Sequence, residues 1–147
     1  PTVNENSDKL NHAPFIFILD KFIAERLKAE GFVNGKKVVS SFIKTPEKAS
    51  KIELSYDLSS VPINPKYPDM VFVYAKIVDA NGTIIPTASN EVTFTLAEGN
   101  ASLIGENPVK AEAGIATIVL KTNDLKKNIK LIAQSLNLQS GTISVSK

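Results

Sequence analysis

The stretch from Asp69 to Leu96 constrains the fold most, because apolar residues recur at every second position in two separate runs. A period of two predicts β-strands with one buried face. In the first run, the face expected to be buried carries Val71, Val73, Ala75 and Ile77. In the second run, it carries Val92, Phe94 and Leu96. The Asp-Ala-Asn-Gly sequence at 79–82 favours a tight turn between them. We therefore predict that the two runs pair in the middle of a β-sandwich.

Further segments of the same kind flank this centre and are separated by turn residues such as Gly, Asn and Pro. The strands that we expect from them are 51–56, 101–104, 115–121, 129–134 and 142–145. After residue 48 the pattern contains no long helical period. Short strands at this spacing predict an all-β, immunoglobulin-like sandwich of about 100 residues.

The first 44 residues are harder to interpret. The apolar block Phe15–Leu19 predicts a short buried strand, because it is brief and bounded by breakers. Asn34-Gly35 is a strong hairpin signal, so we expect residues 27–33 to pair with residues 37–43. The helix formers around residues 23–26 leave a helical turn open as an alternative.

The sequence Thr-Pro-Glu-Lys at 45–48 resembles a linker, since proline resists continuing a central strand. We therefore predict two domains. Residues 1–46 would form a partial β-sheet unit, the C-terminal part of a preceding domain, and residues 47–147 the immunoglobulin-like sandwich. Because the chain starts with Pro1 and has its one Met at position 70, we expect it to be a piece of a longer polypeptide.

Composition excludes several classes of function. A net charge of +2, from 17 basic and 15 acidic side chains, predicts no nucleic-acid partner and no membrane partner. No apolar run approaches the roughly 20 residues of a membrane-spanning helix. The 147 residues contain no cysteine, which excludes disulfides and thiolate metal sites.

Titratable residues give weak candidates for a site. His12 is the only histidine, so it has no partner for zinc and no triad. Four acids could serve as calcium ligands or as a glycosidase pair: Asp69, Asp79, Glu91 and Glu98. We interpret them instead as outward, solubilising charges at strand ends. The prediction is no catalytic residue, no metal ligand and no cofactor-binding residue.

Aromatic residues concentrate near the N-terminus, where five of the seven phenylalanines lie: Phe15, Phe17, Phe22, Phe32 and Phe42. They could stack on sugars, but tryptophan is absent and their strand pattern favours a core. A third interpretation is an exposed patch left by a missing part of the domain. Asn81-Gly82-Thr83 and Asn100-Ala101-Ser102 match the glycosylation pattern, which matters only in a eukaryotic secretory route.

Two stretches carry a family resemblance. Residues 72–94 (FVYAKIVDANGTIIPTASNEVTF) and 104–117 (IGENPVKAEAGIAT) resemble the immunoglobulin-like C-terminal domain of bacterial family 2 glycoside hydrolases. These are the β-galactosidase- and β-glucuronidase-like enzymes common in gut Bacteroides. Upstream, residues 27–39 and 44–48 look like the closing hairpin and the linker of the preceding β-sandwich in those enzymes.

The resemblance implies a module without activity of its own. The catalytic glutamates of that family lie in a TIM barrel, of which no segment is present, so no acid of this chain inherits their roles. The expected partners are the other domains of a parent enzyme that hydrolyses O-glycosidic bonds, with weak carbohydrate contact as an option. Export to the periplasm or beyond is implied by the resemblance alone. An adhesin spacer of the invasin type and an independent carbohydrate-binding module are the alternatives.

Overall fold

The structure is a computed structural model that describes residues 2–3, 9, 11, 15–21, 23–58, 62–64, 67–123 and 128–146. Over these residues the chain is built of β-strands and contains no α-helix. No helix in this described part has the length and apolarity needed to cross a membrane. The chain divides into two compact units, Pro1–Thr45 and Pro46–Lys147.

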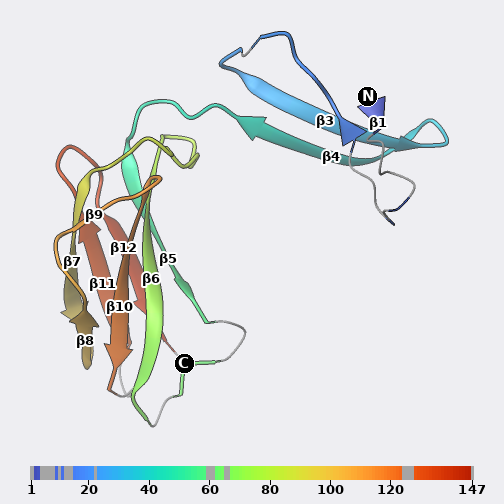
Figure 1. Ribbon diagram of the computed structural model, residues 1–147. Coiled ribbons are helices and arrows are strands. Elements are labelled where there is room, and N and C mark those ends of the chain that lie inside the picture. Colours follow the sequence, from blue (N-terminus) through green and yellow to red (C-terminus); the bar gives the residue numbers. More distant parts are fainter. Residues whose placement is uncertain are drawn as a thin grey trace. The chain divides into compact units, whose positions relative to one another are not determined.

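The second unit is a sandwich of two antiparallel sheets (Figure 1). In spatial order, the first sheet contains β5 (Lys51–Asp57), β6 (Asp69–Val78), β10 (Ile115–Thr122) and β8 (Ala101–Ile104). The second contains β12 (Gly141–Val145), β11 (Ile129–Gln134), β7 (Glu91–Glu98) and the short β9 (Val109–Lys110). With the short β9 left aside, these strands lettered in sequence order reproduce the A-B-E-D and G-F-C sheets of the constant-type immunoglobulin fold. The predicted all-β sandwich is therefore confirmed.

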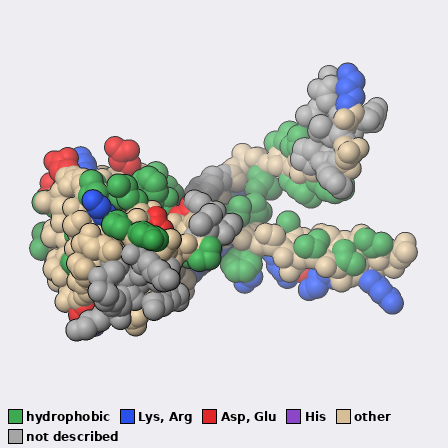
Figure 2. Space-filling view, turned by 90° about the horizontal axis from the view of Figure 1, so that it is seen from below, with side chains coloured by type: hydrophobic (Ala, Val, Ile, Leu, Met, Phe, Trp, Pro, Cys, Tyr) green, Lys and Arg blue, Asp and Glu red, His purple; other side chains and the backbone are tan. Residues whose placement is uncertain are grey.

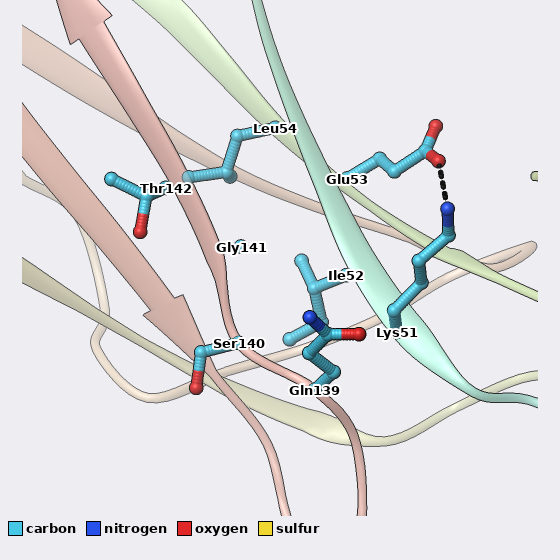
Figure 3. A pocket seen from close by; sticks show the side chains of 8 residues that line it. All are labelled: Lys51, Ile52, Glu53, Leu54, Gln139, Ser140, Gly141 and Thr142. Carbon is cyan, nitrogen blue, oxygen red and sulfur yellow. Dashed lines mark ion pairs between the residues drawn. The ribbon is translucent and has the colours of Figure 1, made fainter.

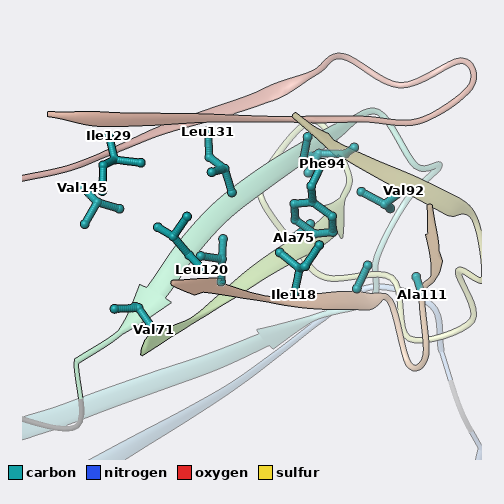
Figure 4. Packing of buried hydrophobic residues seen from close by; sticks show 14 of the residues in the cluster. Val71, Ala75, Val92, Phe94, Ala111, Ile118, Leu120, Ile129, Leu131 and Val145 are labelled. Atoms are coloured by element: carbon teal, nitrogen blue, oxygen red, sulfur yellow. The ribbon is translucent and has the colours of Figure 1, made fainter. Parts of the chain in front are cut away.

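The core lies between the inner faces of the two sheets. Figure 4 shows Val71, Ala75, Ile118 and Leu120 of one sheet pointing toward Phe94 and Leu131 of the other. The predicted inner face of β6 is confirmed, since its members are at most 3% exposed: Val71, Val73, Ala75 and Ile77. On β7, Val92 and Phe94 are buried, and Leu96 packs against the cluster. Burial of this apolar surface is the main stabilising contribution to the sandwich.

The prediction that the two central runs pair with each other is wrong. β6 pairs with β5 and β10, whereas β7 pairs with β11 and β9 in the opposite sheet. Residues 79–90 connect β6 in one sheet to β7 in the other. Within this connection the Ile85 N–H donates to the carbonyl of Ile77, near the end of β6, at 3.0 Å. Alternation predicts which face of each strand is apolar, but not which strand lies beside it. Two strands can bury their apolar faces as neighbours in one sheet or from opposite sheets across a core.

The two sheets are joined at one end by their outer strands. Lys51 of β5 and Gln139 just before β12 form a parallel bridge. The Ile52 N–H donates to the Gln139 carbonyl at 2.9 Å, and the Gln139 N–H donates to the Ser50 carbonyl at 3.0 Å. Gly141 allows this approach, because a Cβ there would lie 2.7 Å from the Ile52 carbonyl oxygen. Beyond this point β5 and β12 diverge.

The first unit contains the predicted hairpin. β3 (Arg26–Val33) and β4 (Lys36–Lys44) pair in antiparallel fashion, with Leu27 opposite Ile43. The turn residues Asn34 and Gly35 have φ values of 49° and 74°, the left-handed conformations that a type I′ turn requires. A bulge follows Gly31. The same unit holds the two-residue strands β1 (Thr2–Val3) and β2 (Phe15–Ile16), which pair with each other.

Two expectations for this unit fail. The segment Phe15–Leu19 is a strand only at its first two residues, and every one of its side chains is exposed, Ile18 to 82%. An apolar strand is buried only where a second layer of the structure covers it, and the described residues of this unit form no such layer. Residues 24 and 25 form a bend, in which the Glu25 N–H donates to the Ile23 carbonyl at 2.8 Å, and Arg26 already begins β3, so the helical alternative is wrong.

Candidate functional site

The four candidate acids do not converge. Asp69 and Asp79 lie at opposite ends of β6, and Glu91 and Glu98 at opposite ends of β7. Glu98 pairs with Lys130 at 3.6 Å on the neighbouring strand. Within the described ranges, no group of three or more His, Cys, Asp or Glu side chains could hold a metal ion. His12 lies outside the described residues.

Asp79 differs from its predicted role, because it is fully buried rather than an outward charge. Its Oδ1 accepts hydrogen bonds from the backbone N–H groups of Asn81 at 2.9 Å and Thr83 at 2.8 Å. Its Oδ2 accepts one from the Glu47 N–H at 3.0 Å. Several N–H donors satisfy a buried carboxylate. Asp79 therefore holds the β6 turn and the start of the second unit together, which is a structural role.

A hollow of about 340 Å³ opens between the diverging strands β5 and β12 (Figure 3). Its lining has one carboxylate, Glu53, which is paired with Lys51 at 2.9 Å. Glycoside hydrolysis needs two carboxyl groups across the scissile bond. This lining supplies only one, so the hollow does not have the groups for that chemistry.

The exposed aromatic side chains are the more informative feature. The core interpretation is wrong for four phenylalanines, which are 59–76% exposed: Phe15, Phe17, Phe32 and Phe42. Phe22 lies outside the described residues. The interpretation as an exposed patch is the one that agrees with the structure, and the β3–β4 hairpin shows how the patch is arranged.

The hairpin is two-faced. The pairs Leu27–Ile43, Ala29–Ser41 and Gly31–Val39 set one face, which also carries Val33. A Cβ at Gly31 would lie 2.7 Å from Val39 Cγ1, so the valine side chain covers the glycine. We call this the apolar face: Leu27, Ala29, Gly31, Val33, Val39, Ser41 and Ile43. Its large side chains are 57–73% exposed: Leu27, Val33, Val39 and Ile43.

The opposite face, which we call the charged face, carries Lys28, Glu30 and Lys37 together with the exposed rings of Phe32 and Phe42. Glu30 accepts from Lys28 at 2.7 Å and from Lys37 at 3.2 Å. These two ammonium groups, Lys28 first, hold the pKa of the Glu30 carboxyl below its ordinary value. The Arg26 guanidinium lies 3.8 Å from the centre of the Phe42 ring, a cation–π contact. Figure 2 shows the Lys and Arg side chains of the hairpin gathered on one of its sides.

The sequence did not reveal this division, because the turn alone does not decide it. The register next to the Asn34-Gly35 turn, extended along the strands, would pair Leu27 with Phe42 and place Ile43 on the opposite face. The bulge after Gly31 shifts the pairing by one residue, so that Leu27 and Ile43 share a face.

A second apolar area lies on the outer face of the sandwich. Phe72 of β6 is opposite Val119 of β10, which is opposite Ile104 of β8. Phe72 is 54% exposed and Ile104 is 43% exposed. An apolar band therefore crosses three strands on the side that faces away from the core.

Fold and surface together define the class: an immunoglobulin-like β-sandwich module preceded by an amphipathic hairpin. Residues 52–144 match the family model of glycoside hydrolase family 2 C-terminal domain 5. The chain belongs to this family. The match favours an enzyme module over an adhesin spacer.

The relatives that the chain matches are much longer than the chain itself. A β-galactosidase of Thermoanaerobacter pseudethanolicus is 32% identical over 135 residues, which cover 86% of this chain and 18% of the relative. The solved β-glycosidase of Bacteroides vulgatus shares the fold with a TM-score of 0.70 at 19% identity, covering 86% of this chain and 18% of that one. A solved family 2 β-glucuronidase has a TM-score of 0.68 at 19% identity and covers 99% of this chain, but only 17% of its own. The chain thus spans less than a fifth of each of these relatives.

Proposed function

We propose that this chain is a non-catalytic C-terminal module of a β-galactosidase-like family 2 glycoside hydrolase. The observation that carries the proposal is the family match over residues 52–144 of the sandwich. The separation of the candidate acids supports the proposal that the module is non-catalytic. Asp79 accepts hydrogen bonds that hold a turn, and Glu98 pairs with Lys130. The complete enzyme would hydrolyse O-glycosidic bonds in the periplasm or outside the cell.

The role of the module is to pack against other domains of the same polypeptide. In this proposal residues 1–46 are the C-terminal part of the preceding domain, and residues 47–147 are the immunoglobulin-like domain. The exposed apolar side chains of the first unit support this assignment, because surfaces of this kind mark contacts with other protein.

Hydrolysis of a chromogenic galactoside tests the proposal. The chain and the complete polypeptide encoded by its gene are assayed at equal molar concentration. We expect turnover by the complete polypeptide and none above the blank by the chain. Turnover by the purified chain would overturn the non-catalytic assignment, and an inactive complete polypeptide would overturn the β-galactosidase-like parent.

A weak contact with carbohydrate is the second part of the proposal, and the band around Phe72 supports it. Aromatic and aliphatic side chains on an open sheet face offer an apolar surface to a sugar ring. Calorimetry with galacto-oligosaccharides should show weak binding that Phe72→Ala abolishes. Unchanged binding in Phe72→Ala would place the carbohydrate contact elsewhere on the chain. The absence of binding by the native chain would overturn the proposal of a carbohydrate contact.

A further inference from the structure

We propose that Asn34, at the tip of the β3–β4 hairpin, is a site of spontaneous deamidation, and that the fold protects Asn81 from the same reaction. These two residues begin the only Asn-Gly dipeptides of the chain. The inference does not depend on the proposed function, since it follows from the surroundings of two turns. Each deamidation replaces a neutral amide by a carboxylate and lowers the net charge of +2 by one unit.

The reaction needs only the dipeptide and water. The Gly35 nitrogen loses its proton to a base in the solvent and attacks Cγ of Asn34. A bond forms between that nitrogen and Cγ, the bond from Cγ to Nδ2 breaks, and Nδ2 takes up a proton and leaves as ammonia. Water then opens the cyclic imide at either carbonyl, which gives aspartate or isoaspartate at position 34. The rate depends on how often the nitrogen and Cγ reach the geometry of attack.

The first argument is the freedom of the hairpin turn. Asn34 and Gly35 are both exposed, and among the described residues no hydrogen bond engages the Gly35 N–H. Even an added Cβ at Gly35 would meet no atom within 4 Å. A two-stranded hairpin is also marginally stable in water, so its turn opens readily. The Gly35 nitrogen is therefore free to approach Cγ.

The second argument is that the turn at Asn81 is held at both reacting groups. The Gly82 N–H donates to the Asp79 carbonyl at 3.1 Å. Nδ2 of Asn81 donates to Oε1 of Glu47 at 3.2 Å. Both bonds must break before the Gly82 nitrogen can attack. Each bond should slow the reaction by roughly a factor of five, which makes the protection at least about tenfold.

Charge acts in the same direction. Oδ1 of Asp79 accepts from the N–H groups of Asn81 at 2.9 Å and Thr83 at 2.8 Å. These two groups flank Gly82, so removing the Gly82 proton would place a second negative charge beside a buried carboxylate. At the hairpin turn the next residue is Lys36 instead, whose positive charge favours loss of the proton.

The two products should affect the hairpin differently. Asn34 and Gly35 have φ values of 49° and 74°, as a type I′ turn requires. Aspartate at position 34 is compatible with this turn, since Asp-Gly also favours it. Isoaspartate adds a methylene group to the main chain, so the two-residue loop no longer fixes the register. The cross-strand contact between Lys37 and Glu30, at 3.2 Å, should then be lost.

Ageing of the full chain followed by mass spectrometry tests the proposal. The chain is incubated at mildly alkaline pH, both folded and in concentrated urea, and the tryptic peptides 29–36 and 77–110 are analysed at intervals. Fragmentation localises each amide-to-acid exchange and separates aspartate from isoaspartate. In the folded chain, Asn34 should react at least about tenfold faster than Asn81. In urea, where neither turn is held, the two rates should agree within about twofold.

Equal rates in the folded chain, or a faster reaction at Asn81, would overturn the inference. Asp79→Asn tests the cause of the protection, because it removes a negative charge and one oxygen acceptor beside Asn81. It should accelerate deamidation of Asn81 by about fivefold and leave the rate at Asn34 unchanged. Circular dichroism checks that this variant folds. An unchanged rate at Asn81 would show that Asp79 is not what protects it.

A matched comparison tests the effect on the hairpin. Asn34→Asp reproduces the aspartate product and should keep the strand pairing of the native chain. The isoaspartate fraction, separated by chromatography from an aged sample, should be cleaved by trypsin after Lys37 at least about tenfold faster than Asn34→Asp, because cleavage follows local opening. Equal cleavage of the two would overturn the proposed effect of isoaspartate on the turn.

Discussion

The sandwich and the hairpin follow the same sequence rule and reach opposite outcomes. Val73 on β6 and Val39 on β4 are both β-branched residues on the apolar face of an alternating strand. Val73 has no exposed area, whereas Val39 is 61% exposed. The difference is a second layer: β6 faces β7 and β11 across a core, and the described residues of the hairpin's own unit supply no such layer.

The comparison shows that alternation specifies a face but not its cover. A strand with period two has an apolar side whatever lies opposite. Whether that side stabilises the protein depends on the apolar area that folding removes from water. For the hairpin this area is small, because its apolar side chains remain exposed. The sandwich is thus expected to unfold as one cooperative domain, and the hairpin to contribute little to its stability.

The sharpest test of this contrast removes the same side-chain atoms from each region. Leu131→Ala in the sandwich core should lower the free energy of unfolding by about 3–5 kcal/mol, because it leaves a cavity. The matched change Leu27→Ala, at a side chain 57% exposed, should stay within about 0.5 kcal/mol. Urea unfolding followed by circular dichroism measures both. Similar losses would mean that the apolar face is already covered in the chain.

The next effect concerns the boundary between linker and sandwich. Asp79→Ala leaves the N–H groups of Glu47, Asn81 and Thr83 without their acceptor and should cost about 2–3 kcal/mol. Asp79→Asn keeps one oxygen acceptor and should cost about 1 kcal/mol. Thermal unfolding of the two variants gives the comparison. If Asp79→Ala were neutral, the buried carboxylate would not be what holds the turn.

A smaller effect separates close packing from turn strain. Gly141→Ala brings a Cβ to 2.7 Å from the Ile52 carbonyl oxygen and should destabilise the sandwich by about 1–3 kcal/mol. Gly35→Ala meets nothing within 4 Å but has a φ of 74°, so its cost of about 1–2 kcal/mol falls on the hairpin alone. The unfolding midpoint of the sandwich should drop in the first variant and stay unchanged in the second. A drop in both would show that the two regions unfold together.

The smallest effect is electrostatic and confined to the hairpin. Since Lys28 and Lys37 lower the pKa of Glu30, they favour its ionised form in the folded hairpin. The resulting stabilisation is present above the ordinary glutamate pKa and is lost as the pH falls through the lowered value. It is weak, because the pair is exposed and screened by salt.

Titration followed by nuclear magnetic resonance checks this point. We expect Lys28→Gln to return the pKa of Glu30 toward its ordinary value by more than Lys37→Gln does, since Lys28 makes the shorter contact. High salt should reduce the shift in the native chain. An unchanged pKa in Lys28→Gln would show that the pair does not form in solution.

Much of the fold could be predicted from local pattern. The inner face of β6 and the Asn34-Gly35 hairpin follow from side-chain period and from the left-handed φ that Asn and Gly tolerate. The partner of β6 could not be predicted, because β5, β7 and β10 all present apolar faces of similar kind. Burial of Asp79 was missed for a related reason: its donors include Glu47, which is distant in sequence.

The sequence by itself determined the longer strands of the sandwich, the inner faces of β6 and β7, the hairpin turn and the scattering of the acids along the chain. These depend on residues within a few positions of one another, and local sterics and periodicity decide them. Only the tertiary structure decided which faces meet and that β6 and β7 belong to different sheets. It also decided that the apolar residues 15–19 are exposed. Those outcomes depend on which surfaces approach in space, and the free energy of burial depends on both partners rather than on either strand alone.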